Sequence, residues 1–419
     1  MDPTDALRAA TRRLHEQLDA LPYASAVLDG TLTIAHYASF LHAVHTVHEA
    51  LEQIVERTGD RALQQLFGQS ARRRGLLARD LAHLRVDLHA VDAAQLRALL
   101  LVQKLRLDAH REPLRLVGHA YVLEGSQLGG PLQARALAAR AELSAGGLAY
   151  LQGAGTATRA GFDDFLERLA PRLNAPEALE HAIVGAQTAF AGFAAILDAL
   201  TPGRVAGRWL VSELNGDAGT HLIPSDLREV SAALQAGEQS HRQFVYYEAR
   251  YGARGRRFTR SDSAWLATLA RGQDHTSTLR QVSWLARTLS SRGMPRLLLE
   301  LHLDVLHRAL VAHVPERAGD YAALADAAQQ LCIEREAALP DQRARGLAAE
   351  FVAALPGAPE HQIDPGEAAR LLLAAIADER AGIAPAVAAL TSWLCDPTRF
   401  GVPWRAAAAR LIAAARSDS

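Results

Sequence analysis

The chain has 419 residues, which is too long for one ordinary domain and about right for two, and 49% of them are hydrophobic, enough for two cores. Alanine, leucine and arginine dominate, and β-branched residues never alternate over a long run, which predicts an all-α protein. The net charge of −1 excludes a global basic field, so neither nucleic acid nor an anionic membrane is expected as a partner.

The first predicted element is an amphipathic helix near the N-terminus. Apolar residues recur at spacings of three and four between Leu7 and Leu18, and His15 lies at the edge of this stripe. Arg8 and Arg12 precede His15 on roughly the same helical face. A lone histidine here would more often be a hydrogen-bonded boundary residue. A histidine aligned with two arginines is better suited to an anionic ligand that also needs an axial nitrogen, and heme is such a ligand.

The next unusual element is a helical pattern that contains Gly125, Gly129 and Gly130. Each glycine inside a helix costs about 1 kcal/mol relative to alanine. Gly125 and Gly129 are four residues apart and share one face, so a flat ligand could lie against this bare face, or the helix could bend there. A close helix–helix crossing through small residues, or a loop, explains the glycines equally well.

Taken together, the two segments resemble the heme oxygenase family, particularly its bacterial biliverdin-forming enzymes. The sequence LRAATRRLHEQLD resembles the proximal helix of that family and GHAYVLEGSQLGG resembles its distal helix, and the resemblance covers about residues 1–200. It implies a helical bundle in which His15 is the axial ligand of the heme iron and Arg8 and Arg12 pair with the heme propionates. The basic residue that the family carries on its last helix is not evident in this sequence.

The resemblance also implies a reaction. Heme would be both substrate and cofactor, and O₂ and external electrons would convert it to biliverdin, CO and ferrous iron. Gly125 and Gly129 would form the distal wall, and Ser126 stands where many animal relatives carry an aspartate that organises water. Because no flavin or nicotinamide motif occurs, the electrons are expected from a separate redox partner such as ferredoxin or a reductase. A bilin-accepting protein or a second copy of the chain are further expected partners.

The helical pattern is interrupted after about residue 200. We predict a heme oxygenase-like domain at residues 1–202, a linker at 203–224 and a second all-helical domain of unknown role at 225–419. Ser225 or Asp226 is expected to cap the first helix after the linker, and Ser261-Asp262-Ser263 is expected to cap another. Further helices are predicted over residues 276–289, 295–311, 321–338, 342–354, 365–377, 384–394 and 404–415.

No chemistry is visible in the sequence of the second half. His302 and His307 are five residues apart, whereas a metal-binding pair prefers three or four, so both are interpreted as surface or hydrogen-bonded histidines. Cys332 and Cys395 are too few for a disulfide scaffold or a thiolate zinc site and are expected to be buried, unreactive thiols. The second domain is therefore expected to mediate self-association or to receive product.

The distribution of charge bears on location and partners. The first twenty residues are charged throughout and no run of 18 apolar residues occurs, which predicts a cytoplasmic protein without a signal peptide or a membrane span. The arginine clusters at 72–74 and 254–257 are interpreted as solvated faces, and the first could alternatively belong to a docking patch for an acidic redox partner.

Two other functions remain open from the sequence. A non-heme di-metal oxidase on the same scaffold needs several inward Glu, Asp and His ligands, and the candidates are Glu49, Glu52, Glu124, Glu177 and His181. Glu-x-x-His spacing is common in such sites, whereas Glu177 and His181 are four residues apart. Alternatively, the N-terminal domain binds heme or a bilin without turnover and signals through the second domain.

Overall fold

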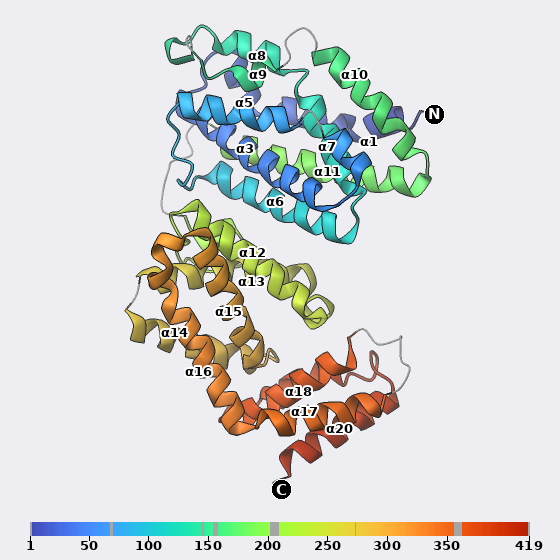
Figure 1. Cartoon of the computed structure of the whole chain (residues 1–419), viewed down its shortest axis with the longest axis vertical. Coiled ribbons are helices and arrows are strands. Elements are labelled where there is room, and N and C mark those ends of the chain that lie inside the picture. The colour runs from blue at the N-terminus through green and yellow to red at the C-terminus, as the bar shows by residue number, and fades with distance from the viewer. Residues whose placement is uncertain are drawn as a thin grey trace. The chain divides into compact units, whose positions relative to one another are not determined.

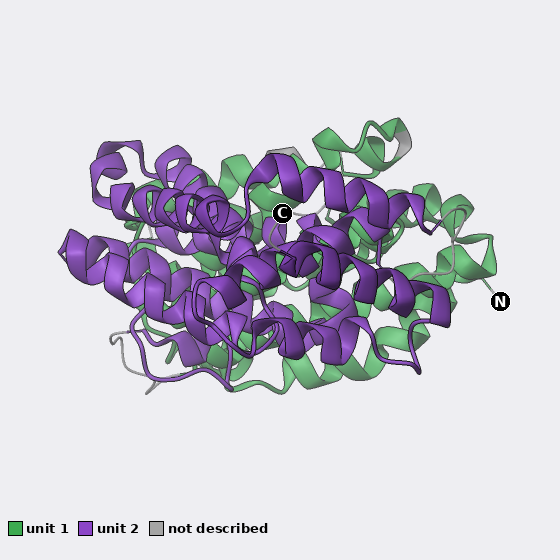
Figure 2. Cartoon of the chain, turned by 90° about the horizontal axis from the view of Figure 1, so that it is seen from below, with its two compact units in different colours: residues 1–207 green, residues 208–419 purple. Residues whose placement is uncertain are grey.

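The structure is a computed structural model that describes residues 2–67, 70–143, 146–153, 158–201, 209–272, 274–355 and 363–417. Within these ranges the regular structure is helical, and an isolated β-bridge joins Leu210 and Leu222, so the all-α prediction is confirmed. The chain divides into two compact units, residues 1–207 and 208–419, which Figure 2 shows in green and purple. The predicted domain limits at 202 and 225 stay a prediction.

Unit 1 is a bundle whose middle is formed by α7 and α11, which lie side by side, with α1 and α6 also packed against α11 (Figure 1). Asp2, Thr33 and Asp92 cap three of its helices, because each side chain accepts a backbone N–H of the first turn. The α-helices are α1 Pro3–Asp19, α2 Pro22–Leu28, α3 Ile34–Arg57, α4 Arg61–Leu66, α5 Ser70–His83, α6 Ala93–Arg111, α7 Arg115–Ser126, α8 Gly130–Leu137, α9 Ala149–Gln152, α10 Thr158–Leu169 and α11 Pro176–Ala199.

Two glycines let the backbones of α7 and α11 touch. A Cβ atom at Gly118 would lie 1.9 Å from the carbonyl oxygen of Ala182, and one at Gly185 would lie 2.0 Å from that of Arg115. By length and composition α11 is also the helix of the described ranges that could cross a membrane. Its close crossing with α7 buries part of this apolar sequence, as is typical of the core helix of a bundle.

The crossing predicts a large effect on stability. Gly118→Ala should lower the free energy of unfolding by about 3 kcal/mol or more, because the added methyl group meets backbone that cannot yield. Urea unfolding followed by circular dichroism measures this. The matched control is Gly161→Ala in α10, where nothing lies within 4 Å of an added Cβ atom and helix propensity favours alanine. Equal unfolding midpoints for the two variants would contradict the crossing.

Unit 2 is also helical, and its helices begin and end within a few residues of the predicted limits. Asp226 caps α12 by accepting a hydrogen bond from the N–H of Arg228 at 3.0 Å. Ser225 and Asp226 were the two residues expected to supply this cap. The helices are α12 Leu227–Gln243, α13 Val245–Gly272, α14 His275–Ser290, α15 Arg296–His313, α16 Ala322–Ala338, α17 Asp341–Ala353, α18 Pro365–Arg380, α19 Ala386–Leu394 and α20 Val402–Arg416.

The prediction of a helix start at residues 261–263 is wrong, because α13 runs through them. The Ser261 hydroxyl donates to the carbonyl of Phe258, and the Ser263 hydroxyl donates to that of Thr259. Both serine hydroxyls therefore donate to the preceding turn of their own helix. Serine can form such bonds inside a helix as well as cap a helix start. The actual break in α13 lies earlier, at Gly252, whose φ of +52° kinks the helix.

Two further interpretations need correction. Arg256 is buried and donates to Glu238 at 3.1 Å and to Glu248 at 2.5 Å, so the arginine cluster at 254–257 is not simply a solvated face. Cys332 and Cys395 are half-buried rather than buried. Partial burial still raises the pKa of both thiols, to about 11 for Cys332, so both are expected to react slowly as nucleophiles.

Candidate functional site

His15 lies on the side of α1 that faces solvent, next to the buried stripe that ends at Thr11. Its Nδ1 atom lies 2.9 Å from Oδ2 of Asp19, one turn later, and its side chain is 62% exposed. The ring also makes an edge contact with Phe190 of α11, at 6.0 Å between ring centroids. A carboxylate that accepts a hydrogen bond from Nδ1–H fixes the orientation of the imidazole and leaves Nε2 as the atom suited to bind a metal ion.

Arg8 and Arg12 are both exposed on α1, on the same side of the helix as His15. Arg8 pairs with the exposed carboxylate of Asp5, at 2.8 Å between Nη1 and Oδ1. Exposed pairs of this kind are worth about 1 kcal/mol or less, so Arg8 can turn to another anion at little cost. The helix thus presents one imidazole and two guanidinium groups to the same side.

The glycine segment is a bend between two helices, which is one of the alternatives that the sequence left open. α7 ends at Ser126 and α8 begins at Gly130. The N–H of Leu128 donates to the carbonyl of Gly125 at 3.1 Å, and the N–H of Gly130 donates to that of Gln127 at 3.2 Å. These bonds span three residues instead of four and tighten the chain at the end of α7.

The three glycines of this bend differ in what they allow. A Cβ atom at Gly130 would lie 2.4 Å from the carbonyl oxygen of Leu151, so packing against α9 requires this glycine. At Gly125 the nearest atom would be Cε2 of Phe162 at 3.6 Å, and at Gly129 it would be 3.9 Å away, both ordinary contacts. Packing within the protein therefore explains Gly130 and does not explain the other two. Their bare backbone is consistent with a ligand that approaches it closely.

Residues 1–199 match the family model described as heme oxygenase. The N-terminal half of the chain is heme oxygenase-like. Among the solved structures that match, the heme oxygenase from Leptospira interrogans is 19% identical with a TM-score of 0.43, and the match covers 47% of this chain and 99% of that one. Heme oxygenase-1 from the cyanobacterium Synechocystis, in complex with heme, is 19% identical with a TM-score of 0.42, with coverage of 47% and 91%. No curated protein matches, and the family model does not reach the second half.

A polar cluster lies beside the bend of this heme oxygenase-like half. Buried Glu124 of α7 forms an ion pair with Arg73 of α5; burial raises the pKa of Glu124, and the guanidinium opposes that rise. Burial likewise raises the pKa of Tyr150, whose hydroxyl interacts with the side chains of Ser126 and Gln127. The cluster connects the end of α7 to α5 and α9 and so holds the bend in place.

The same cluster bears on the di-metal alternative. Arg74 lies 3.2 Å from the buried carboxylate of Glu52 but its side chain is still 42% exposed, and Arg73 pairs with buried Glu124, so the cluster at 72–74 is not simply a solvated face. The side chain of Arg72 lies outside the described part. His181 lies 3.9 Å from Glu177 and 3.4 Å from Glu112, near the surface. Two candidate metal ligands, Glu52 and Glu124, thus form ion pairs with arginines. The described residues hold no group of three or more side chains that could bind a metal ion.

The structure places further residues beside the predicted site residues that the sequence did not single out. Asp19 is one, and its spacing of four from His15 is a signal that the sequence does contain. Phe162 beside Gly125 and Phe190 beside His15 come from α10 and α11, and no local pattern connects them to the site.

Proposed function

We propose that the N-terminal unit is a heme oxygenase, which uses O₂ and external electrons to convert heme to biliverdin, CO and ferrous iron. The observation that carries this proposal is the room at Gly125 and Gly129, which packing leaves unexplained. It is supported by the His15–Asp19 pair on α1 and by the family match over residues 1–199.

The residues present fit heme. His15 would hold the iron through Nε2, since Asp19 accepts a hydrogen bond from Nδ1 and keeps the ring oriented. Arg8 and Arg12 would pair with the propionates. Bound heme supplies both the metal that activates O₂ and the ring that is oxidised.

The residues of the glycine bend would control access and protons. Gly125 and Gly129 keep side chains away from the reacting face, so that only small molecules fit beside the ring. The Ser126 hydroxyl is exposed and donates to the carbonyl of Leu123 at 2.8 Å, which places its oxygen to accept a hydrogen bond from water. Electrons would come from a separate partner such as ferredoxin or a reductase.

CO release tests the proposed function. The full-length protein is loaded with one equivalent of heme and given O₂ with ferredoxin and its reductase, and released CO is trapped with deoxymyoglobin. We expect about one CO per heme. Stable heme binding without CO would contradict the proposal and favour a heme-binding sensor. Absence of heme binding, with two irons per chain, would favour the di-metal oxidase.

The His15–Asp19 contact on α1 predicts that loss of Asp19 weakens heme binding without abolishing it. Asp19→Ala should weaken heme binding by roughly tenfold, because loss of an outer partner of a metal-binding histidine typically costs ten- to a hundredfold in affinity. Absorbance titration with hemin measures this. The control is Glu16→Ala, an exposed carboxylate on α1 that points to a different side of the helix. If both variants bind hemin equally well, the His15–Asp19 contact does not orient a ligand.

A further inference from the structure

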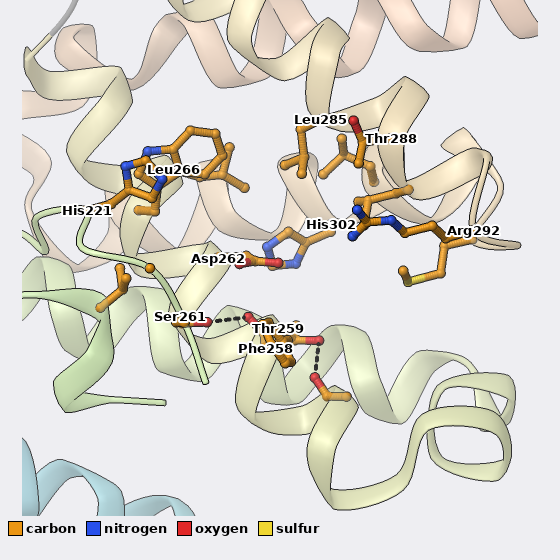
Figure 3. Close-up of a pocket in the computed structure, with 18 of the residues that line it drawn as sticks. His221, Phe258, Thr259, Ser261, Asp262, Leu266, Leu285, Thr288, Arg292 and His302 are labelled. Carbon is orange, nitrogen blue, oxygen red and sulfur yellow. Dashed lines mark hydrogen bonds between the residues drawn. The ribbon is translucent and has the colours of Figure 1, made fainter. Parts of the chain in front are cut away.

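Unit 2 encloses a cavity of about 1210 Å³, which lies outside the region that the family model matches. Its walls come from α13, α14 and α15 and from the segment 211–221 (Figure 3). Pockets for ordinary drug-sized ligands measure about 300–1,000 Å³, so this cavity suits a larger molecule. Every lining residue belongs to unit 2, and a binding site in this half was not visible from the sequence.

The cavity walls are rich in aromatic and apolar side chains. One stripe of α13, from Tyr247 to Leu266, and one stripe of α14, from Ser277 to Leu289, face it along several helical turns. Trp284 lies on the second stripe and is 59% exposed, so its ring is available to stack on a ligand in the cavity. Further aromatic lining residues are Tyr251, Phe258 and Trp265. Such walls favour a long, flat, conjugated ligand.

Exposed arginines also line the cavity. Arg254, Arg280 and Arg292 come from α13, from α14 and from the loop after α14. Arg250 has a different role, since its guanidinium donates to the carbonyls of Gly293 and Ala389 and so supports the fold. Guanidinium groups at the solvent side of an apolar cavity bind carboxylates through charge-assisted hydrogen bonds.

One residue of the α13 stripe carries a carboxyl group. Asp262 lines the cavity close to the middle of the view in Figure 3, near His302. Burial raises the pKa of Asp262 to about 7, and a hydrogen bond with Ser261 opposes this rise. A carboxyl group in such apolar surroundings is stabilised by a ligand that offers N–H donors.

His302 does not suit a heme iron. Its Nδ1 atom lies 2.8 Å from the Ser240 hydroxyl and its Nε2 atom lies 3.1 Å from the Ser263 hydroxyl, so both ring nitrogens are engaged. Burial lowers its pKa to about 4, so the ring is neutral. Recognition at the centre of the cavity therefore rests on hydrogen bonds and stacking, without a metal.

We propose that this cavity binds a linear tetrapyrrole with carboxylate side chains. The aromatic walls would stack on its pyrrole rings, Asp262 would pair with the pyrrole N–H groups, and Arg280 and Arg292 would pair with the carboxylates. A fatty acid would also meet the arginines, but it offers no N–H group to Asp262 and no flat ring to the aromatic walls. The choice of a linear tetrapyrrole rests on the proposed function, whose product has this chemistry.

Biliverdin binding to the full-length protein tests this proposal. Affinity and stoichiometry are measured from the visible absorbance and circular dichroism of the bilin. We expect Asp262→Asn to weaken binding about tenfold, since a hydrogen bond to a charged group in apolar surroundings is lost. Asparagine has almost the same shape as aspartate, so this variant should fold. The double variant Arg280→Ala/Arg292→Ala should weaken binding about fivefold, as expected for exposed charge pairs.

Two variants serve as controls for location. Arg308→Ala removes an exposed arginine of α15 that pairs with Asp304 and does not line the cavity, so it should leave biliverdin binding unchanged. His15→Ala disrupts the proposed heme site of unit 1 and should also leave biliverdin binding unchanged.

The outcomes separate the two proposals. Loss of biliverdin binding in His15→Ala, wild-type affinity in both cavity variants, or complete displacement of biliverdin by stoichiometric oleate would each overturn the cavity proposal. If biliverdin binds with the expected variant pattern while heme yields no CO, the cavity proposal stands and the oxygenase proposal fails. If heme is cleaved and biliverdin does not bind to unit 2, the oxygenase proposal stands and the cavity proposal fails.

Discussion

His15→Ala should abolish ligation of heme iron by the protein and reduce heme turnover to the background rate. His15 is exposed and lies outside the buried stripe of α1, so its removal should leave helicity and the unfolding midpoint unchanged. The ferric electron paramagnetic resonance spectrum at low temperature and the rate of heme loss measure the two effects. His110→Ala, an exposed histidine at the end of α6, is the matched control.

An unchanged spin spectrum in His15→Ala would show that another group ligates the iron. Recovery of the spectrum on addition of imidazole would support the assignment, because the small molecule would replace the missing ring in the space left by the substitution.

Gly129→Leu should reduce heme turnover at least tenfold while changing the free energy of unfolding by less than about 1 kcal/mol. Nothing lies closer than 3.9 Å to a Cβ atom at this position, so the protein has room for the first carbon of the side chain. The rest of the leucine would extend over the face that the proposal gives to heme and O₂. Turnover is followed by loss of the heme absorbance with O₂ and reductant.

Two further substitutions make this experiment specific. Gly75→Leu places the same side chain on the exposed side of α5, where nothing lies within 4 Å, and should leave turnover unchanged. Gly130→Ala should instead destabilise the fold, because its Cβ atom would lie 2.4 Å from the carbonyl oxygen of Leu151. Wild-type turnover in Gly129→Leu would show that the bare face has no ligand to accommodate.

The local part of the site could be predicted from the sequence. Helical periodicity alone places Arg8, Arg12 and His15 on one side of α1, where the structure has them exposed. It also indicates that the glycine segment permits a bend. Which glycine serves packing is decided by Leu151, whose carbonyl comes from another helix, and no local pattern reveals that.

Long-range pairing explains the errors. Arg73 lies in a run of three arginines and was expected at the surface, yet it forms an ion pair with buried Glu124, 51 residues later in the chain. Arg256 is buried for the same reason, beside Glu238. The cavity of unit 2 was equally hidden, since α14 was predicted as an ordinary amphipathic helix and residues 261–263 of α13 were expected to be a helix start. Only their separation in the fold turns apolar stripes into cavity walls.

The most direct test of the central claim, that the N-terminal unit degrades heme at His15 and the glycine bend, is the identity of the tetrapyrrole after turnover. Full-length protein carrying one equivalent of heme is exposed to O₂ and reductant, and the products are separated by chromatography and weighed by mass spectrometry. The account predicts biliverdin, with iron released, in wild-type protein and not in His15→Ala. Recovery of intact heme from the wild-type protein, or equal biliverdin yields from both proteins, would contradict it.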